Sequence, residues 1–279
     1  MVTDTLIKKY TQSIDDLQKV DLTIDTLSLI RKFDSRYKMQ INQHFSLQKK
    51  YFQSNFTKNQ RLITHLFLEI SSVWFCFEIL ILICKEYDIQ KKTFLVKETR
   101  KKGNEFLVSF LNESHFKNNS NEIIKDFYSE SVVLFDKISN KNLKTIFLSE
   151  IHKILNALII ANNKLGKSDY NSSIQTFIDE ISEIERIYKA NFNRTQKNRE
   201  EYLCKHIDFE CFMGFCYALR NQYVHNGLAY NFESNKDKLF VQALQNIKNC
   251  LNHLVLALAV AILKTINRNR ELIPEKTNN

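Results

Sequence analysis

The chain has 279 residues, 44% of them hydrophobic and 25% charged, so it is long enough to bury a core in one large domain or two small ones and does not have the composition of a disordered protein. One proline and four glycines are too few for the frequent tight turns of a β-rich fold, and their scarcity favours long helices. The formal net charge of +9 is compatible with a polyanionic partner such as nucleic acid, although the lysine- and asparagine-rich usage of an AT-rich genome accounts for part of it.

Apolar residues recur at intervals of three and four along nearly the whole sequence, which predicts amphipathic helices and no strands. The predicted helices span residues 4–31, 35–58, 61–87, 92–112, 120–138, 141–164, 171–199, 204–226 and 236–268, and the first is open to division in two. Clusters of Asn, Ser, Asp and Gly at 112–121, 164–173 and 226–236 predict loops. The expected fold class is therefore all-α, a multi-helix bundle.

The last four predicted helices carry enough apolar surface to form a bundle by themselves. Leu251, Leu254, Leu256, Leu258 and Ile262 form a nearly continuous apolar surface, and Ile151, Leu155, Leu158 and Ile159 share a face. Residues 140–279 are accordingly the predicted functional domain. Residues 1–139 are a helical extension of unassigned role, in which the only tryptophan, Trp74, lies among phenylalanines and predicts a core of its own.

The cysteines lie in apolar helical stretches without a CxxC pair, and the polar start MVTDTLIKKY does not resemble a signal peptide. We therefore expect reduced core cysteines in a cytoplasmic protein that uses no metal and no cofactor. A zinc site of Cys204, His206, Cys211 and Cys216 is the alternative to core packing, but it lacks the close cysteine pair of most structural zinc sites.

The strongest membrane candidate spans residues 62–84 and carries His65, Glu69 and Glu78. Because an acidic side chain costs about 2.5 to 3.5 kcal/mol at the centre of a bilayer, we expect this segment to be a buried helix of a soluble protein without a membrane partner.

The most informative stretch is FECFMGFCYALRNQYVHNG at 209–227, an apolar helix that ends with Arg220, Asn221 and His225. This pattern resembles the signature of the HEPN ribonuclease superfamily. That signature is an Arg, often followed by Asn, His or Asp, and a His after four to six intervening residues, at the end of a helix in an all-helical bundle.

The resemblance implies a HEPN-like bundle of four or five helices in the C-terminal part, with Arg220, Asn221 and His225 as site residues. It also implies a metal-independent endoribonuclease that cleaves single-stranded RNA to a 2′,3′-cyclic phosphate. The expected assembly is a homodimer whose composite site holds two Arg and two His. The expected setting is a prokaryotic toxin or abortive-infection system, with an antitoxin or an activating ligand as a further partner.

The residues alone support parts of this chemistry. Gly227 suits the position just past a helix end, so His225 should lie in the last turn, where the helix dipole favours an imidazolium. Such a His can act as a general acid or base, and the planar fork of Arg220 can bind a phosphate through two hydrogen bonds. On an ideal helix Arg220 and His225 are about 140 degrees apart, whereas Asn221 shares the face of His225. A second copy, approaching along the row that begins with Gly214 and Ala218, would bring both residue types together.

Other interpretations stay open. Arg199 and His206 also have an acceptable spacing, but Glu200 follows Arg199 and the pair lies in a charged run, so we treat it as a chance match. Arg220 could instead pair with Asp208 or Glu210, and His225 could be an ordinary helix-end residue. The alternative function is a non-catalytic helical module that binds RNA, a nucleotide or a protein. Some HEPN toxins carry a Tyr two positions after the His, where this chain has Gly227, so Tyr230 is given no role.

Basic groups accompanied by aromatic residues occur at residues 49–52, 91–94, 100–102 and 192–199. They fit an RNA-binding surface, although solvated helix faces are the commoner explanation for such groups. His44, His65, His115, His152 and His253 show no metal-ligand spacing and are assigned no chemistry. The absence of nucleotide-binding and serine-hydrolase motifs removes the usual support for those classes.

Overall fold

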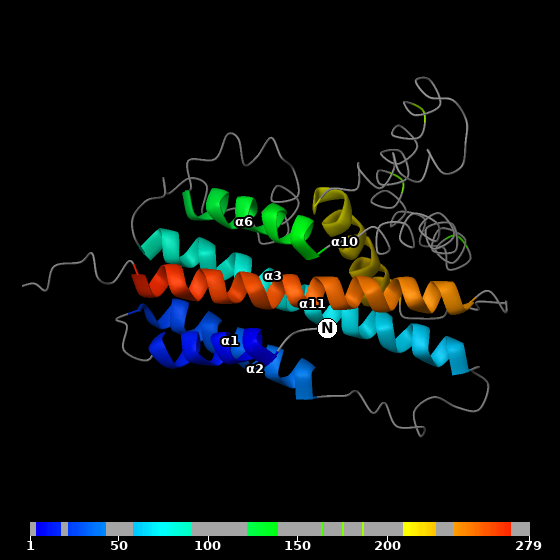
Figure 1. Ribbon diagram of the computed structural model, residues 1–279, viewed down its shortest axis with the longest axis horizontal. Coiled ribbons are helices and arrows are strands. Elements are labelled where there is room, and N and C mark those ends of the chain that lie inside the picture. Colours follow the sequence, from blue (N-terminus) through cyan, green and yellow to red (C-terminus); the bar gives the residue numbers. More distant parts are fainter. Residues whose placement is uncertain are drawn as a thin grey trace, which may run out of the picture. The chain divides into compact units, whose positions relative to one another are not determined.

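The computed structural model describes residues 4–17, 22–42, 58–90, 122–138, 209–226 and 237–268, together with the single helical positions 163, 175 and 186. This part of the chain is an all-α multi-helix bundle, as the sequence predicts (Figure 1). Its helices are α1 (Asp4–Leu17), α2 (Ile24–Asn42), α3 (Lys58–Gln90), α6 (Glu122–Ile138), α10 (Phe209–Asn226) and α11 (Asp237–Arg268).

The predicted helix at 4–31 is divided in two, as the sequence left open, but the predicted break between 4–31 and 35–58 is absent because α2 runs through it. Instead of a break near residue 33, α2 continues to Asn42, because Phe33 is buried and Asp34 pairs with Lys38 one turn later. The real start of α2 is fixed by Thr23, whose Oγ1 accepts a hydrogen bond from the Thr26 backbone N–H at 3.3 Å. Thr23 is thus an N-cap, a role that the helical periodicity did not reveal.

The later helices agree with the prediction where they are described. Helices α3, α6 and α11 match the predicted 61–87, 120–138 and 236–268 to within a few residues, and α10 ends at residue 226 as expected. The predicted helices at 92–112, 141–164 and 171–199 lie outside the described residues, apart from the helical positions 163, 175 and 186.

The chain divides into two compact units, each built from segments that are distant in the sequence. The first unit comprises Met1–Met39, Phe75–Leu134 and Asn252–Asn279, and the second comprises Gln40–Trp74 and Phe135–Leu251. Helices α3 and α11 each contribute to both units. The predicted boundary between residues 139 and 140 lies outside the described residues and stays a prediction.

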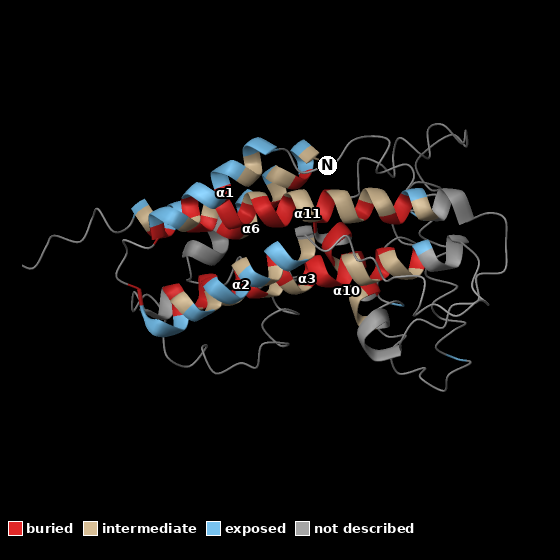
Figure 2. Ribbon diagram, turned by 90° about the horizontal axis from the view of Figure 1, so that it is seen from below, coloured by how far each residue is buried: buried red, intermediate tan, exposed pale blue. Residues whose placement is uncertain are grey.

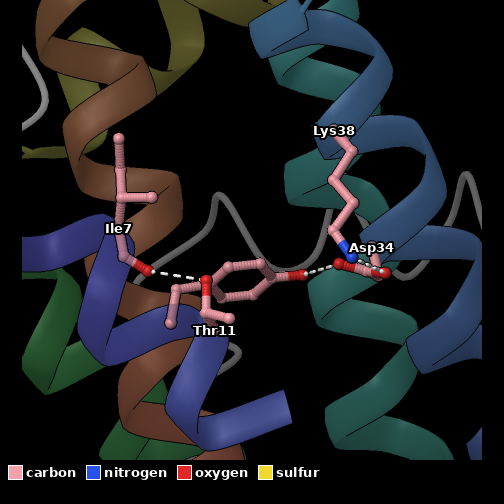
Figure 3. A network of polar contacts seen from close by, with 5 residues as sticks. Ile7, Thr11, Asp34 and Lys38 are labelled. Atoms are coloured by element: carbon pink, nitrogen blue, oxygen red, sulfur yellow. Dashed lines mark hydrogen bonds and ion pairs between the residues drawn. The ribbon is translucent and has the colours of Figure 1, made fainter. Parts of the chain in front are cut away.

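In the first unit, α1 and α2 lie side by side through an aromatic cluster (Figure 1). Tyr10 makes edge contacts with Phe33 and Tyr37, with ring centroids 5.9 and 5.6 Å apart. The Tyr10 hydroxyl donates to Asp34 Oδ1 at 3.0 Å, and Lys38 Nζ donates to Asp34 Oδ2 at 2.8 Å, so one carboxylate links the two helices (Figure 3). Much of the outer surface of α1 is exposed (Figure 2).

The core of the second unit is shared by helices from both halves of the sequence. The Trp74 ring of α3 lies 5.7 Å from the Tyr217 ring of α10, and the Phe135 ring of α6 lies 5.0 Å from the Phe212 ring of α10. The expectation that Trp74 belongs to a core formed by residues 1–139 alone is therefore wrong. The Trp74 and Phe135 rings both contact helix α10, which is distant in the sequence.

The apolar surface predicted on α11 is buried as expected: Leu251, Leu254, Leu256 and Leu258 are fully buried, and Ile262 is 6% exposed (Figure 2). Four cysteines, Cys76, Cys84, Cys216 and Cys250, are free and buried, as predicted for a reduced protein, and the side chains of Cys204 and Cys211 lie outside the described residues. Burial raises the pKa of the Cys76 and Cys250 thiols to about 12, so both stay protonated at neutral pH.

Two helical stretches of the described residues are long and apolar enough to cross a membrane, Leu62–Tyr87 and Val241–Arg268. In their apolar windows 72% and 61% of the residues are buried inside the protein. Core helices of soluble proteins show the same burial, so length and composition alone make only a weak case for a membrane span. The cytoplasmic location stays a prediction.

Candidate active site on helix α10

One face of helix α10 carries large side chains that are buried in the protein core. Phe209, Phe212, Met213, Phe215, Cys216 and Leu219 are each at most 2% exposed. Phe209 and Phe212 contact the Phe135 ring, and one turn further Tyr217 contacts Trp74, so successive turns of α10 are fixed by aromatic contacts. The opposite face is only half-buried, and it carries Gly214, Arg220 and Asn221.

The structure places the side chains of Arg220 and Asn221 in direct contact. Arg220 Nη1 donates a hydrogen bond to Asn221 Oδ1 at 2.9 Å in a partly buried setting. Consecutive helical residues point about 100 degrees apart, so this bond requires the guanidinium to bend around the helix towards the direction of Asn221. Asn221 and His225 are one helical turn apart, so they share a face of the helix. The hydrogen bond to Asn221 therefore turns the Arg220 guanidinium towards the face that carries position 225.

His225 occupies the expected place in the chain. Helix α10 ends at Asn226, which puts the backbone of His225 in the last helical turn and Gly227 immediately after the helix. The side chain of His225 lies outside the described residues, as do Gly227 and the side chain of Ala218. The two described members of the predicted site are therefore brought together, and the contacts of the third are not described.

The competing interpretations of this region fall largely outside the described residues. This applies to Arg199, His206, Asp208 and Tyr230, and to the side chain of Glu210. Of the four zinc candidates, only the Cys216 side chain is described. It is fully buried, and burial together with neighbouring Cys250 raises the pKa of its thiol well above the usual value. This burial agrees with the predicted core packing of Cys216.

No family model, curated protein or solved structure matches this chain.

The interpretation of α10 therefore depends on its residues and on their geometry. Within the described ranges, no group of three or more His, Cys, Asp or Glu side chains is placed to hold a metal ion. What the site does offer is a positive, planar hydrogen-bond donor in the C-terminal part of helix α10, oriented by a neutral amide. A guanidinium so placed can bind a phosphate group.

A second polar cluster was not foreseen from the sequence. Glu69 Oε1 of α3 lies 3.4 Å from His65 Nε2, and Glu69 Oε2 lies 3.2 Å from Lys248 Nζ of α11. Burial alone would raise the pKa of Glu69, but the hydrogen bonds and positive charge of His65 and Lys248 outweigh it and lower the pKa below its usual value. The spacing of four residues between His65 and Glu69 was a usable signal. The partner Lys248, 179 positions beyond Glu69 in the sequence, could not be identified from that spacing.

Proposed function

We propose that this protein is a metal-independent endoribonuclease of the HEPN type that cleaves single-stranded RNA, with Arg220 and His225 as its catalytic residues. The observation that carries the proposal is the hydrogen bond from Arg220 to Asn221 on a helix whose last turn contains His225. A guanidinium oriented by a hydrogen bond to an amide presents a positive, planar set of donors that suits a phosphate group.

The proposed reaction needs only groups that protein side chains supply. The 2′-hydroxyl of one nucleotide attacks the adjacent phosphorus, the new bond from O2′ to phosphorus forms, and the bond from phosphorus to O5′ breaks. One imidazole takes the proton of the 2′-hydroxyl, and one imidazolium gives a proton to the departing O5′. The guanidinium of Arg220 stabilises the negative charge that builds on the phosphoryl oxygens.

The need for one imidazole as base and one imidazolium as acid favours a site built from two copies of the chain. A single His225 cannot be protonated and deprotonated at once, whereas a homodimer that places two copies of α10 together has one of each. The half-exposed Gly214 on the same helix allows a second backbone to approach closely. Because a nuclease without further control would damage its host, the proposal includes an antitoxin or an activating ligand as a partner. It also includes a role in prokaryotic defence and a location in the cytoplasm.

The test is cleavage of end-labelled single-stranded RNA in the presence of EDTA. We expect the unmodified protein to yield fragments ending in a 2′,3′-cyclic phosphate, and Arg220→Ala and His225→Ala each to lose about 100-fold or more of the rate. Arg31→Ala, which removes an exposed arginine from α2, is the matched control and should leave the rate unchanged.

Circular dichroism and the fluorescence of Trp74, which is fully buried, establish that each variant is folded. Equal cleavage by all four proteins would identify a contaminating nuclease and overturn the assignment. RNA binding without cleavage, weakened by Arg220→Ala, would favour the non-catalytic binding module instead.

A further inference from the structure

We propose that the first compact unit contains a binding site for a small organic cation, an ammonium group carried on a short apolar body. The site is a cavity between α3, α6 and α11. It is independent of the motif on α10, which belongs to the second unit, and the proposal goes beyond the nuclease activity.

The cavity has an apolar floor and a polar mouth. The space between its lining side chains, counted together with the open mouth, amounts to about 470 Å³. The floor is formed by side chains that are at most 6% exposed, namely Cys84, Tyr87, Phe127, Ile262 and Ile266. At the mouth stand two exposed residues, Glu130 from α6 and Thr265 from α11.

The polar groups at the mouth favour a cation. The Thr265 hydroxyl already donates to the Ala261 carbonyl oxygen of its own helix at 3.0 Å. Glu130 makes no hydrogen bond or ion pair with any residue in the described part of the chain, so its carboxylate is available to a ligand. An anionic ligand would face this carboxylate without compensation from a positively charged residue among the described residues that line the cavity.

The aromatic rings of the lining point to the same chemistry. Tyr87 and Phe127 line the cavity, and Phe127 is fixed by a stacked contact with Phe77 at 6.0 Å between ring centroids. Ring faces attract ammonium groups, and the interaction strengthens where water is excluded. Two aromatic side chains and a carboxylate that line one cavity are a combination that binds alkyl- or arylammonium ions better than neutral molecules of the same shape.

The experiment is a calorimetric titration of the full-length protein with three compounds of similar shape: benzylammonium, benzyl alcohol and benzoate. We expect benzylammonium to bind with the highest affinity and benzoate not to bind. Glu130→Gln should weaken benzylammonium binding about tenfold while leaving any binding of benzyl alcohol unchanged. Asp136→Asn, which removes an exposed carboxylate further along α6, is the matched control and should bind like the unmodified protein.

A second variant tests the cavity itself. Ala261 is half-exposed and lines the cavity, so Ala261→Leu should reduce the affinity for both benzylammonium and benzyl alcohol by filling their space. Binding of benzoate as strong as that of benzylammonium, or benzylammonium binding that neither Glu130→Gln nor Ala261→Leu weakens, would overturn the proposal. So would the absence of benzylammonium binding at millimolar concentration. RNA cleavage is not part of the readout, so this result is independent of the proposed nuclease.

Discussion

Arg220 and Asn221 are neighbours in the sequence whose side chains would ordinarily point about 100 degrees apart on a helix, yet Arg220 Nη1 donates to Asn221 Oδ1 at 2.9 Å. The bond turns the Arg220 guanidinium towards the helix face that carries positions 221 and 225. It gives Asn221 a positioning role in the proposed site, since the amide fixes where the guanidinium lies without neutralising it.

The first prediction concerns this positioning role. Asn221→Ala should lower kcat for RNA cleavage by roughly 10- to 100-fold with a smaller change in KM, because the guanidinium would lose its orientation and keep its charge. Asn221→Asp retains an acceptor oxygen and should restore the orientation, but it partly neutralises the guanidinium and should weaken RNA binding. Single-turnover and steady-state kinetics on the same RNA separate the two effects. An Asn221→Ala variant with unchanged kcat would show that the hydrogen bond has no part in the reaction.

The second prediction concerns the Glu69 cluster. The pKa of Glu69 is lower in the folded protein than its ordinary value of 4.5, so its contribution to stability is present above about pH 4.5 and is lost as the pH falls through the folded pKa. At pH 7, Glu69→Gln should lower the free energy of unfolding by about 1 to 2 kcal/mol, because Lys248 and His65 lose a charged acceptor.

Urea unfolding of both proteins between about pH 7 and pH 3 measures this difference, which should shrink towards the acid end. The exposed Asp15 offers a control, since Asp15→Asn should follow the unmodified protein. A Glu69→Gln effect that stays constant over this range would show that the charge of Glu69 does not stabilise the fold.

The third prediction concerns alkaline pH. Burial and then the neighbouring Asp34 raise the pKa of the Tyr10 phenol far above its ordinary value of 10.0. The folded protein therefore keeps this proton above pH 10 while the unfolded chain loses it, so the stabilising contribution is complete below about pH 10 and declines as the pH rises further.

Tyr10→Phe should accordingly cost about 1 kcal/mol at pH 7, through loss of the hydrogen bond to Asp34, and should lose stability less steeply above about pH 10 than the unmodified protein. Unfolding curves at about pH 7, 9 and 11 provide the measurement. Thr11→Ala on the same helix, which removes only an exposed hydroxyl bonded to the Ile7 carbonyl, should leave the alkaline slope unchanged (Figure 3). An identical alkaline slope for Tyr10→Phe would contradict the assignment.

The fourth prediction concerns the start of α2. Thr23→Ala removes the oxygen that accepts the Thr26 N–H and should lower stability by about 1 kcal/mol, whereas Thr23→Ser retains that oxygen and should change stability little. Thermal unfolding followed by circular dichroism compares the two. Equal stability of the alanine and serine variants would show that the cap contributes nothing.

Much of the fold could be predicted from periodicity, for a physical reason. Helices such as α3 and α11 present large apolar faces whose spacing is set by the backbone, so their existence and ends follow from the sequence alone. The sequence left open that the first helix is divided in two, as it is, but it did not locate the division, because Thr23 resembles any other polar residue until its hydroxyl is seen to cap the next helix.

The candidate site was predictable in part. The sequence singled out Arg220 and Asn221, whose side chains are in contact, and it placed the backbone of His225 at the helix end, because a glycine after an apolar helix marks its end. The bend of the guanidinium towards Asn221 was not predictable from ideal helical angles, since it depends on the arginine side chain and not on the backbone. The contact of Glu69 with Lys248 and the cation cavity each require helices distant in the sequence to pack together, which local patterns do not encode.

The most direct test of the central claim, that Arg220 and His225 act together in one site built from two copies, is subunit complementation. Arg220→Ala and His225→Ala proteins are prepared separately, mixed, exchanged through mild denaturation and refolding, and assayed on labelled RNA in EDTA. A mixed dimer retains one arginine and one histidine, so we predict that the mixture cleaves measurably faster than either inactive preparation alone, yet well below the unmodified rate because one of the two imidazoles is missing. If the mixture stays inactive while unmodified protein recovers its activity after the same treatment, the two residues do not share a composite site and the account is contradicted.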